Sequence, residues 1–121
     1  MQKAAQIVCR QYGGQLPADY ADLRALPGIG DYTAGAIASI AFGIPAPAVD
    51  GNVLRVFARL DNNSADITKP AAKREFTARV LEEMPKERPG PYNEALMELG
   101  ALVCLPNGAP KCEVCPLAAQ C

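Results

Sequence analysis

Four cysteines stand close together in residues 104–121, at Cys104, Cys112, Cys115 and Cys121. Their spacing, Cys-x7-Cys-x2-Cys-x5-Cys, allows four thiolates to converge on one centre without help from the rest of the fold. Thiolates are ligands that iron–sulfur clusters and zinc share. Cysteines clustered at one end of a chain indicate a metal-binding loop, whereas dispersed pairs would indicate disulfides.

The choice of metal follows from what accompanies these cysteines. Structural zinc usually takes two separated Cys-x2-Cys pairs or adds histidines, and this chain has one such pair and no histidine. The pattern favours a [4Fe–4S] cluster, with zinc or an empty or oxidised loop as alternatives. Two disulfides would require an oxidising compartment, and the first residues are not typical of a secretion signal. We therefore expect a cytoplasmic protein, with Cys9 as a packed thiol on an apolar helix face.

Charge and hydropathy limit the function classes further. Half of the 121 residues are hydrophobic, which is enough for the core of one domain or part of one. No apolar run reaches the ~20 residues of a membrane helix, so no membrane contact is expected. The net charge of -1 argues mildly against nucleic acid, because nonspecific DNA affinity comes from Lys and Arg. Helix N-termini can still hold phosphate without any net charge.

The apolar pattern is helical from end to end, so the fold class is all-α. Proline and glycine positions divide the chain into six expected helices: residues 2–12, 17–26, 32–42, 53–60, 70–84 and 92–103. Asp31 is expected to cap the third helix, and the small residues of that helix indicate deep burial against other helices. The expected organisation is a helical region over 1–103, with a hairpin at about 18–42 and a loop at 43–53, followed by the cysteine loop at 104–121.

Two short segments carry candidate chemistry. Pro27-Gly28-Ile29-Gly30 forms a tight turn whose glycines permit close approach of another molecule, and the helix start after it suits a phosphate. Asp50 precedes a helix and, from its position alone, is interpreted as an N-cap worth ~1 kcal/mol. A helix start also keeps a carboxylate ionised, as stabilisation of a positive charge on a sugar would require.

Three segments together resemble the endonuclease III superfamily of helix-hairpin-helix DNA glycosylases. Residues 26–37 resemble its helix-hairpin-helix, residues 49–56 its Gly/Pro-rich catalytic loop with an essential aspartate, and residues 92–104 the helix that enters its cluster loop. The sequence Asp50-Gly51-Asn52-Val53 resembles the corresponding segment of the MutY-type adenine glycosylases. Tyr32 stands where bifunctional members carry a nucleophilic lysine, and tyrosine has no amine to form a Schiff base.

The resemblance implies a monofunctional base-excision repair glycosylase that removes adenine mispaired with 8-oxoguanine or guanine from double-stranded DNA, after flipping the base. It implies that Asp50 is catalytic and stabilises an oxocarbenium-like sugar. The implied DNA-binding residues are Gly28, Ile29, Gly30, Tyr32, Thr33, Asn52 and Arg55. The implied ligands of a [4Fe–4S] cluster are Cys104, Cys112, Cys115 and Cys121. Arg55 and Arg59 could be surface residues, phosphate contacts or partners of Asp50.

The chain departs from the family in two respects. Its first cysteine gap is x7 where the usual pattern has x6, and Asn107-Gly108 would absorb the extra residue. The family's chain also begins earlier, so the glutamate that protonates adenine is expected upstream. The fold is then incomplete at the N-terminus, and the chain alone is expected to be inactive. Apolar surface on Ala36, Ile37 and Ile40 would recruit the missing portion or drive self-association. The alternatives are a non-catalytic DNA-binding module and an endonuclease III-like glycosylase/lyase.

Overall fold

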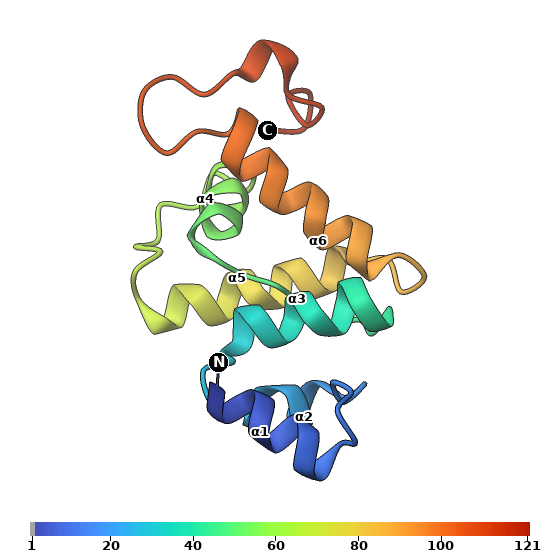
Figure 1. The fold of residues 1–121 in the computed structure, drawn as a ribbon. Coiled ribbons are helices and arrows are strands. Elements are labelled where there is room, and N and C mark those ends of the chain that lie inside the picture. The colour runs from blue at the N-terminus through green and yellow to red at the C-terminus, as the bar shows by residue number, and fades with distance from the viewer. Residues whose placement is uncertain (1) are drawn as a thin grey trace.

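The computed structural model describes residues 2–121, and every regular element in this range is helical (Figure 1). The all-α expectation is therefore confirmed. No helix in the described range is long and apolar enough to cross a membrane. The elements are α1 (Gln2–Gln11), α2 (Tyr20–Ala25), α3 (Asp31–Phe42), α4 (Gly51–Leu60), α5 (Pro70–Glu83), α6 (Pro89–Glu98), a π-helix η1 (Leu99–Val103) and a 3-10 turn η2 (Cys112–Val114).

The helices form two groups, and α3 lies between them (Figure 1). α1 and α2 form the N-terminal end, where Leu23 and Leu26 are buried. α3 packs against α2 on one side and α6 on the other. α4, α5 and α6 enclose the largest core, and the cysteine loop lies beyond α4 and η1. The stripe expected on α5 is buried in full, at Ala72, Phe76, Val80 and Met84.

The N-terminal helix corrects one expectation. Its buried face contains Ala4 and Val8, whereas Ala5 and Cys9 are exposed. The prediction of a packed thiol at Cys9 was wrong. Among the described residues, the hydrophobic face of α1 packs against Leu26 and Ile29. The neighbouring apolar positions on that helix are therefore left in solvent.

Two helix starts also differ from expectation. α2 begins at Tyr20 rather than at Pro17, because the side chain of Asp19 accepts the Asp22 N–H at 3.0 Å and caps the helix there. The N-cap of α3 is Gly30, and Asp31 is the first helical residue. The predicted cap at Asp31 was therefore wrong.

The carboxylate of Asp31 turns back to α2 and pairs with the Arg24 guanidinium. This hydrogen bond is the main reason that the pKa of Asp31 lies below its usual range. The hairpin is thus tied by an exposed ion pair, which solvent screens.

Further differences lie in α3, α4 and α6, and α4 begins at Gly51 rather than at residue 53. One face of α3 is buried at Ala34, Gly35, Ala38 and Ser39 as expected, but Ile40 is 46% exposed. The deep burial expected all round α3 therefore holds for one face only. The exposure of Ile40, beside the half-buried Ala36 and Ile37, agrees with the apolar surface expected on this helix. α6 begins at Pro89 rather than at residue 92, and it continues through η1 to Val103 as expected.

Candidate functional site

Asp50 caps α4 with both of its carboxylate oxygens engaged. Oδ1 accepts the backbone N–H groups of Asn52 and Val53, each at 2.9 Å, and Oδ2 accepts the Asn52 side-chain amide at 2.9 Å. The capping interpretation is therefore confirmed. Three donors and the helix start hold one half-buried anion in a single orientation. Such a fixed anion can also stabilise a cation placed beside it.

The loop at residues 43–50 that carries Asp50 is fixed by one buried amide. Asn93 on α6 has no exposed surface. Its Nδ2 donates to the Ser39 Oγ at 2.8 Å and to the Ala46 carbonyl at 2.9 Å, while its Oδ1 accepts the Ala48 N–H at 3.2 Å. This side chain therefore joins α6, α3 and the loop at one point.

The same loop lies directly on the backbone of α3. A Cβ at Gly35 would stand 1.9 Å from the Pro47 carbonyl oxygen. The contact thus requires glycine, because any side chain would push the loop away from the helix. Gly35 and Asn93 together set the position from which Asp50 begins α4.

The hairpin presents backbone to solvent. Gly28 has φ +84°, a conformation that L side chains rarely adopt, and Gly30 caps α3 without a side chain. A Cβ at either glycine would meet nothing within 4 Å. Thr33 is exposed in the first turn of α3, where free amides point outward. Ile29 is half-buried and packs into the hydrophobic clusters on both sides of it, so it also anchors the turn.

Tyr32 lies in the first turn of α3 and reaches toward α6. It is 38% exposed, and its hydroxyl lies 3.5 Å from the Met97 Sδ on α6. Tyr32 and Val49 border one cavity of about 480 Å³, whose opposite wall on α5 includes Lys73. The structure therefore brings Tyr32 near the residue that precedes Asp50.

Asn52 and Arg55 extend the contacts of Asp50 toward the cysteine loop. The Asn52 Oδ1 accepts from the Arg55 Nη2 at 3.0 Å. The same guanidinium donates to the carbonyls of Gly100 at 2.7 Å and Cys104 at 3.0 Å. The resemblance implied that Arg55 contacts DNA. In the structure Arg55 is half-buried, and these hydrogen bonds go to acceptors within the chain. Its link with Asp50 runs through Asn52.

This chain of contacts depends on close packing of η1 against α4. A Cβ at Gly100 would lie 2.7 Å from the Asn52 Cβ. The wide turn of η1 places the Cys104 N–H 2.7 Å from the Leu99 carbonyl. The carbonyls of Gly100 within η1 and of Cys104 directly after it both accept from Arg55.

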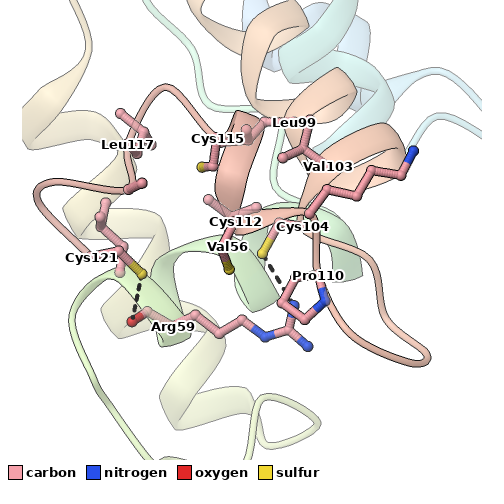
Figure 2. Close-up of a pocket in the computed structure, with 13 residues that line it drawn as sticks. Val56, Arg59, Leu99, Val103, Cys104, Pro110, Cys112, Cys115, Leu117 and Cys121 are labelled. Atoms are coloured by element: carbon pink, nitrogen blue, oxygen red, sulfur yellow. Dashed lines mark hydrogen bonds between the residues drawn. The ribbon is translucent and has the colours of Figure 1, made fainter.

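The four cysteines line one cavity of about 280 Å³ (Figure 2). Its apolar wall comes from α4, η1 and the last residues, and includes Val56, Leu99, Val103 and Leu117. Arg59 and Lys111 are the charged residues that line it, and no Asp or Glu among the described residues does so. These two cations can offset part of the negative charge that four ligating thiolates would bring to the cavity.

The donor set of this cavity is four thiol groups. Among residues 2–121 no three Cys, Asp or Glu side chains come close enough to hold a single metal ion. All five cysteines are free. A four-iron cluster places each thiolate on a different iron, so its ligands stand around a volume, as these four do (Figure 2).

The comparisons with known sequences give a consistent picture. Residues 11–40 match the helix-hairpin-helix motif family. The chain is 42% identical over 122 aligned residues to human adenine DNA glycosylase, which covers 100% of this chain and 22% of the human protein. It is 40% identical to adenine DNA glycosylase of Mycobacterium tuberculosis H37Rv, covering 97% of this chain and 38% of that protein. The chain thus spans well under half the length of these curated relatives.

Solved structures share the fold. A thermostable thymine-DNA glycosylase superposes with a TM-score of 0.80 at 31% identity, and an endonuclease III in a non-covalent DNA complex with 0.79 at 32% identity. Each match covers 99% of this chain and 54% of the other chain. The fold and the site define a helix-hairpin-helix DNA glycosylase region. Within that class, the chain is similar over nearly its whole length to adenine DNA glycosylases and corresponds to part of their length.

Several residues that shape the site were not among the predicted ones. Asn93 and Gly100 lie on the buried stripe of α6 and η1 together with Leu96. An amide and a glycine at helical spacing within an apolar stripe were therefore the sequence signal that could have identified them. Gly35 was noted only as one of several small residues in its helix. Arg59 was left without an assigned role, although it lies one helical turn beyond Arg55.

Proposed function

We propose that this chain supplies the sugar-stabilising anion, the phosphate-binding hairpin and a metal-binding loop of a base-excision repair adenine DNA glycosylase. The proposed substrate is adenine opposite 8-oxoguanine or guanine in double-stranded DNA, and the proposed location is the cytoplasm. The observation that carries the proposal is the geometry of Asp50. It is a half-buried carboxylate fixed by three donors at the start of a helix, in a chain whose relatives are adenine DNA glycosylases.

In the proposed reaction the N-glycosidic bond of a flipped adenosine breaks, and its electron pair leaves with the base. The sugar becomes oxocarbenium-like, and the fixed carboxylate of Asp50 stabilises that charge. Water then adds to the anomeric carbon and loses a proton. Among the described residues no second carboxylate contacts Asp50. We therefore assign Asp50 the anionic role and leave protonation of adenine to a separate group.

The hairpin is proposed to hold the DNA backbone. Gly28 and Gly30 face open space, and the first amides of α3 can donate to a phosphate. Contacts of this kind position the protein without reading the sequence. They need little net positive charge, which agrees with the net charge of -1.

The metal-binding loop is proposed to hold a [4Fe–4S] cluster on Cys104, Cys112, Cys115 and Cys121. When bound, the cluster would cross-link the loop and provide a one-electron centre. The shared cavity and the absence of acidic groups among its described lining residues support this assignment.

A second candidate is a DNA-binding module without catalysis. It is favoured by the same hydrogen bonds, because the capping role of Asp50 accounts for that residue without any chemistry. An endonuclease III-like lyase is disfavoured, since Tyr32 offers no amine.

The test is a single-turnover assay of the enzyme that carries this chain, on duplexes containing A:8-oxoguanine, A:G, A:T or C:8-oxoguanine. We expect adenine release from the first two duplexes only, with strand breakage appearing only after alkali treatment. Tight binding of the mispaired duplexes without release of adenine from any of them would favour the DNA-binding module. Breakage without alkali would favour a lyase.

A further inference from the structure

Arg59 touches both ends of the cysteine run. Its Nη1 donates to the Cys104 Sγ at 3.2 Å and to the Leu105 carbonyl at 2.9 Å. Its own backbone carbonyl lies 3.7 Å from the Cys121 Sγ (Figure 2). A single half-buried residue of α4 therefore contacts the sulfur atoms of the first and the last cysteine of the motif.

The charge around the cavity gives these contacts a consequence. Four thiolates carry negative charge, and the cationic groups lining the cavity are Arg59 and Lys111. Lys111 is exposed, so its field is screened by solvent. Arg59 is half-buried and donates directly to a sulfur atom, and hydrogen bonds to ligating sulfurs are among the features that set the reduction potential of an iron–sulfur cluster.

Arg59 differs in this respect from Arg55. Arg55 donates to the backbone carbonyl of Cys104 and toward Asn52, so it joins the loop to the Asp50 end of α4. Arg59 instead donates to the Cys104 sulfur itself. The two arginines, one helical turn apart, thus act on different parts of the same cysteine.

We propose that Arg59 is the positioning residue of the cluster, holding the Cys104 ligand against α4 and stabilising the more negative, reduced state of the bound group. This inference rests on the proposed [4Fe–4S] site. Removing the guanidinium should release iron faster, because partners that orient a metal ligand typically contribute about 10–100-fold in metal affinity. It should also lower the reduction potential, since the reduced cluster loses a compensating positive charge.

The experiment compares the parent protein, Arg59→Met, Arg59→Lys and the control Arg10→Gln, all purified without oxygen. Arg10 is exposed on α1. That helix lies at the end of the molecule opposite the cysteine loop (Figure 1). Iron content, visible absorbance, reduction potential by film voltammetry and the rate of iron transfer to a ferrous chelator are measured. Circular dichroism reports whether each variant is folded.

We expect about four irons in the parent protein and in Arg10→Gln, with equal potentials and equal rates. Arg59→Met should release iron about tenfold faster or more and have a lower potential. Arg59→Lys should recover most of the potential through its charge. It should still release iron faster than the parent protein, because the shorter lysine side chain does not reach the position from which the Arg59 Nη1 donates to the sulfur and to the Leu105 carbonyl.

Each other outcome overturns a defined part of the argument. Parental rate and potential in folded Arg59→Met, with iron present, would reject the role of Arg59 and leave the cluster assignment standing. A parent protein with stoichiometric zinc or no iron would reject the cluster and this inference with it. If Arg59→Met does not fold, Arg59→Lys decides, and parental iron release by that variant would reject the positioning role.

Discussion

Asp50 and Arg55 are joined through one intervening side chain, the amide of Asn52, which donates to Asp50 at 2.9 Å and accepts from Arg55 at 3.0 Å. Because Arg55 also donates to the Cys104 carbonyl, the first turn of α4 links the candidate catalytic carboxylate to the cysteine loop. A disturbance of the loop should therefore reach Asp50 through two side chains.

Asp50→Asn tests the charge of the carboxylate apart from its capping role. Asparagine caps helices about as well as aspartate, so stability should change little. Base release by the enzyme that carries this chain should fall by at least about 10²-fold, while binding of the A:8-oxoguanine duplex is kept. Single-turnover adenine release and duplex affinity are measured side by side. A rate equal to that of the parent enzyme would remove Asp50 from the mechanism.

Arg55→Met should loosen the junction between α4 and η1. The variant leaves the Gly100 and Cys104 carbonyls without this donor, and the free energy of unfolding should fall by about 1–3 kcal/mol. Amide exchange over residues 100–105 should accelerate. The matched control is Arg74→Met, an exposed position on α5, which should remain within ~0.5 kcal/mol of the parent protein. Equal stability of the two variants would contradict a structural role for Arg55.

Gly35→Ala should be severely destabilising. The new methyl group would stand 1.9 Å from the Pro47 carbonyl oxygen, whereas at Gly30 it would meet nothing within 4 Å. We expect a loss of about 3 kcal/mol or more for Gly35→Ala and less than about 1 kcal/mol for Gly30→Ala. Chemical denaturation of both variants measures the difference. Similar values would show that the loop does not lie on α3 as described.

Gly30→Val should weaken DNA binding with little dependence on sequence. The added bulk lies where a phosphate is proposed to approach, so matched and mispaired duplexes should lose affinity alike. The slope of log affinity against log salt should change by about one unit or less. Ala21→Val, on the exposed side of α2, adds comparable bulk as a control. Parental affinity in folded Gly30→Val would exclude the hairpin as a phosphate site.

Tyr92→Phe should alter stability at alkaline pH. Burial raises the pKa of Tyr92 from 10.0 to about 12, so the fold favours the neutral phenol. This contribution is complete below pH ~10 and is lost as the pH rises from about 10 toward 12, where the unfolded chain ionises first. Partial exposure limits it to about 1 kcal/mol. Melting of parent and variant at pH 8 to 11.5 should show a steeper decline in the parent protein. Parallel curves would contradict the shift.

The features predictable from the sequence were those set by local chemistry. The α5 stripe, the tight hairpin and the cap at Asp50 follow from residue periodicity and from the preference of aspartate for helix starts. Two predictions were wrong because each depends on a neighbour. Asp31 pairs with Arg24 on another helix instead of capping its own. Cys9 is exposed because the contact face of α1 is narrow.

The contacts that support the site could not be predicted from local sequence either, because they also depend on distant residues. Asn93 lies 47 positions after Ala46 in the sequence and donates to its carbonyl. Gly100 on η1 packs directly against Asn52 on α4. Periodicity marks such positions as buried but does not name their partners. The roles of Arg55 and Arg59 likewise became visible only when η1 and the cysteine loop were placed beside α4.

The π-helix η1 makes the chain unequally tolerant of length changes on the two sides of Cys104. Before Cys104, each inserted or deleted residue would rotate the following chain by about 100° and turn the cysteine away from Arg55 and Arg59. After Cys104, the exposed segment around Asn107 and Gly108, where Gly108 has φ +75°, can take up an added residue without such a rotation. Cys104 is thus the point at which helical phase ceases to constrain the chain, and the longer first cysteine gap falls on the permissive side of it.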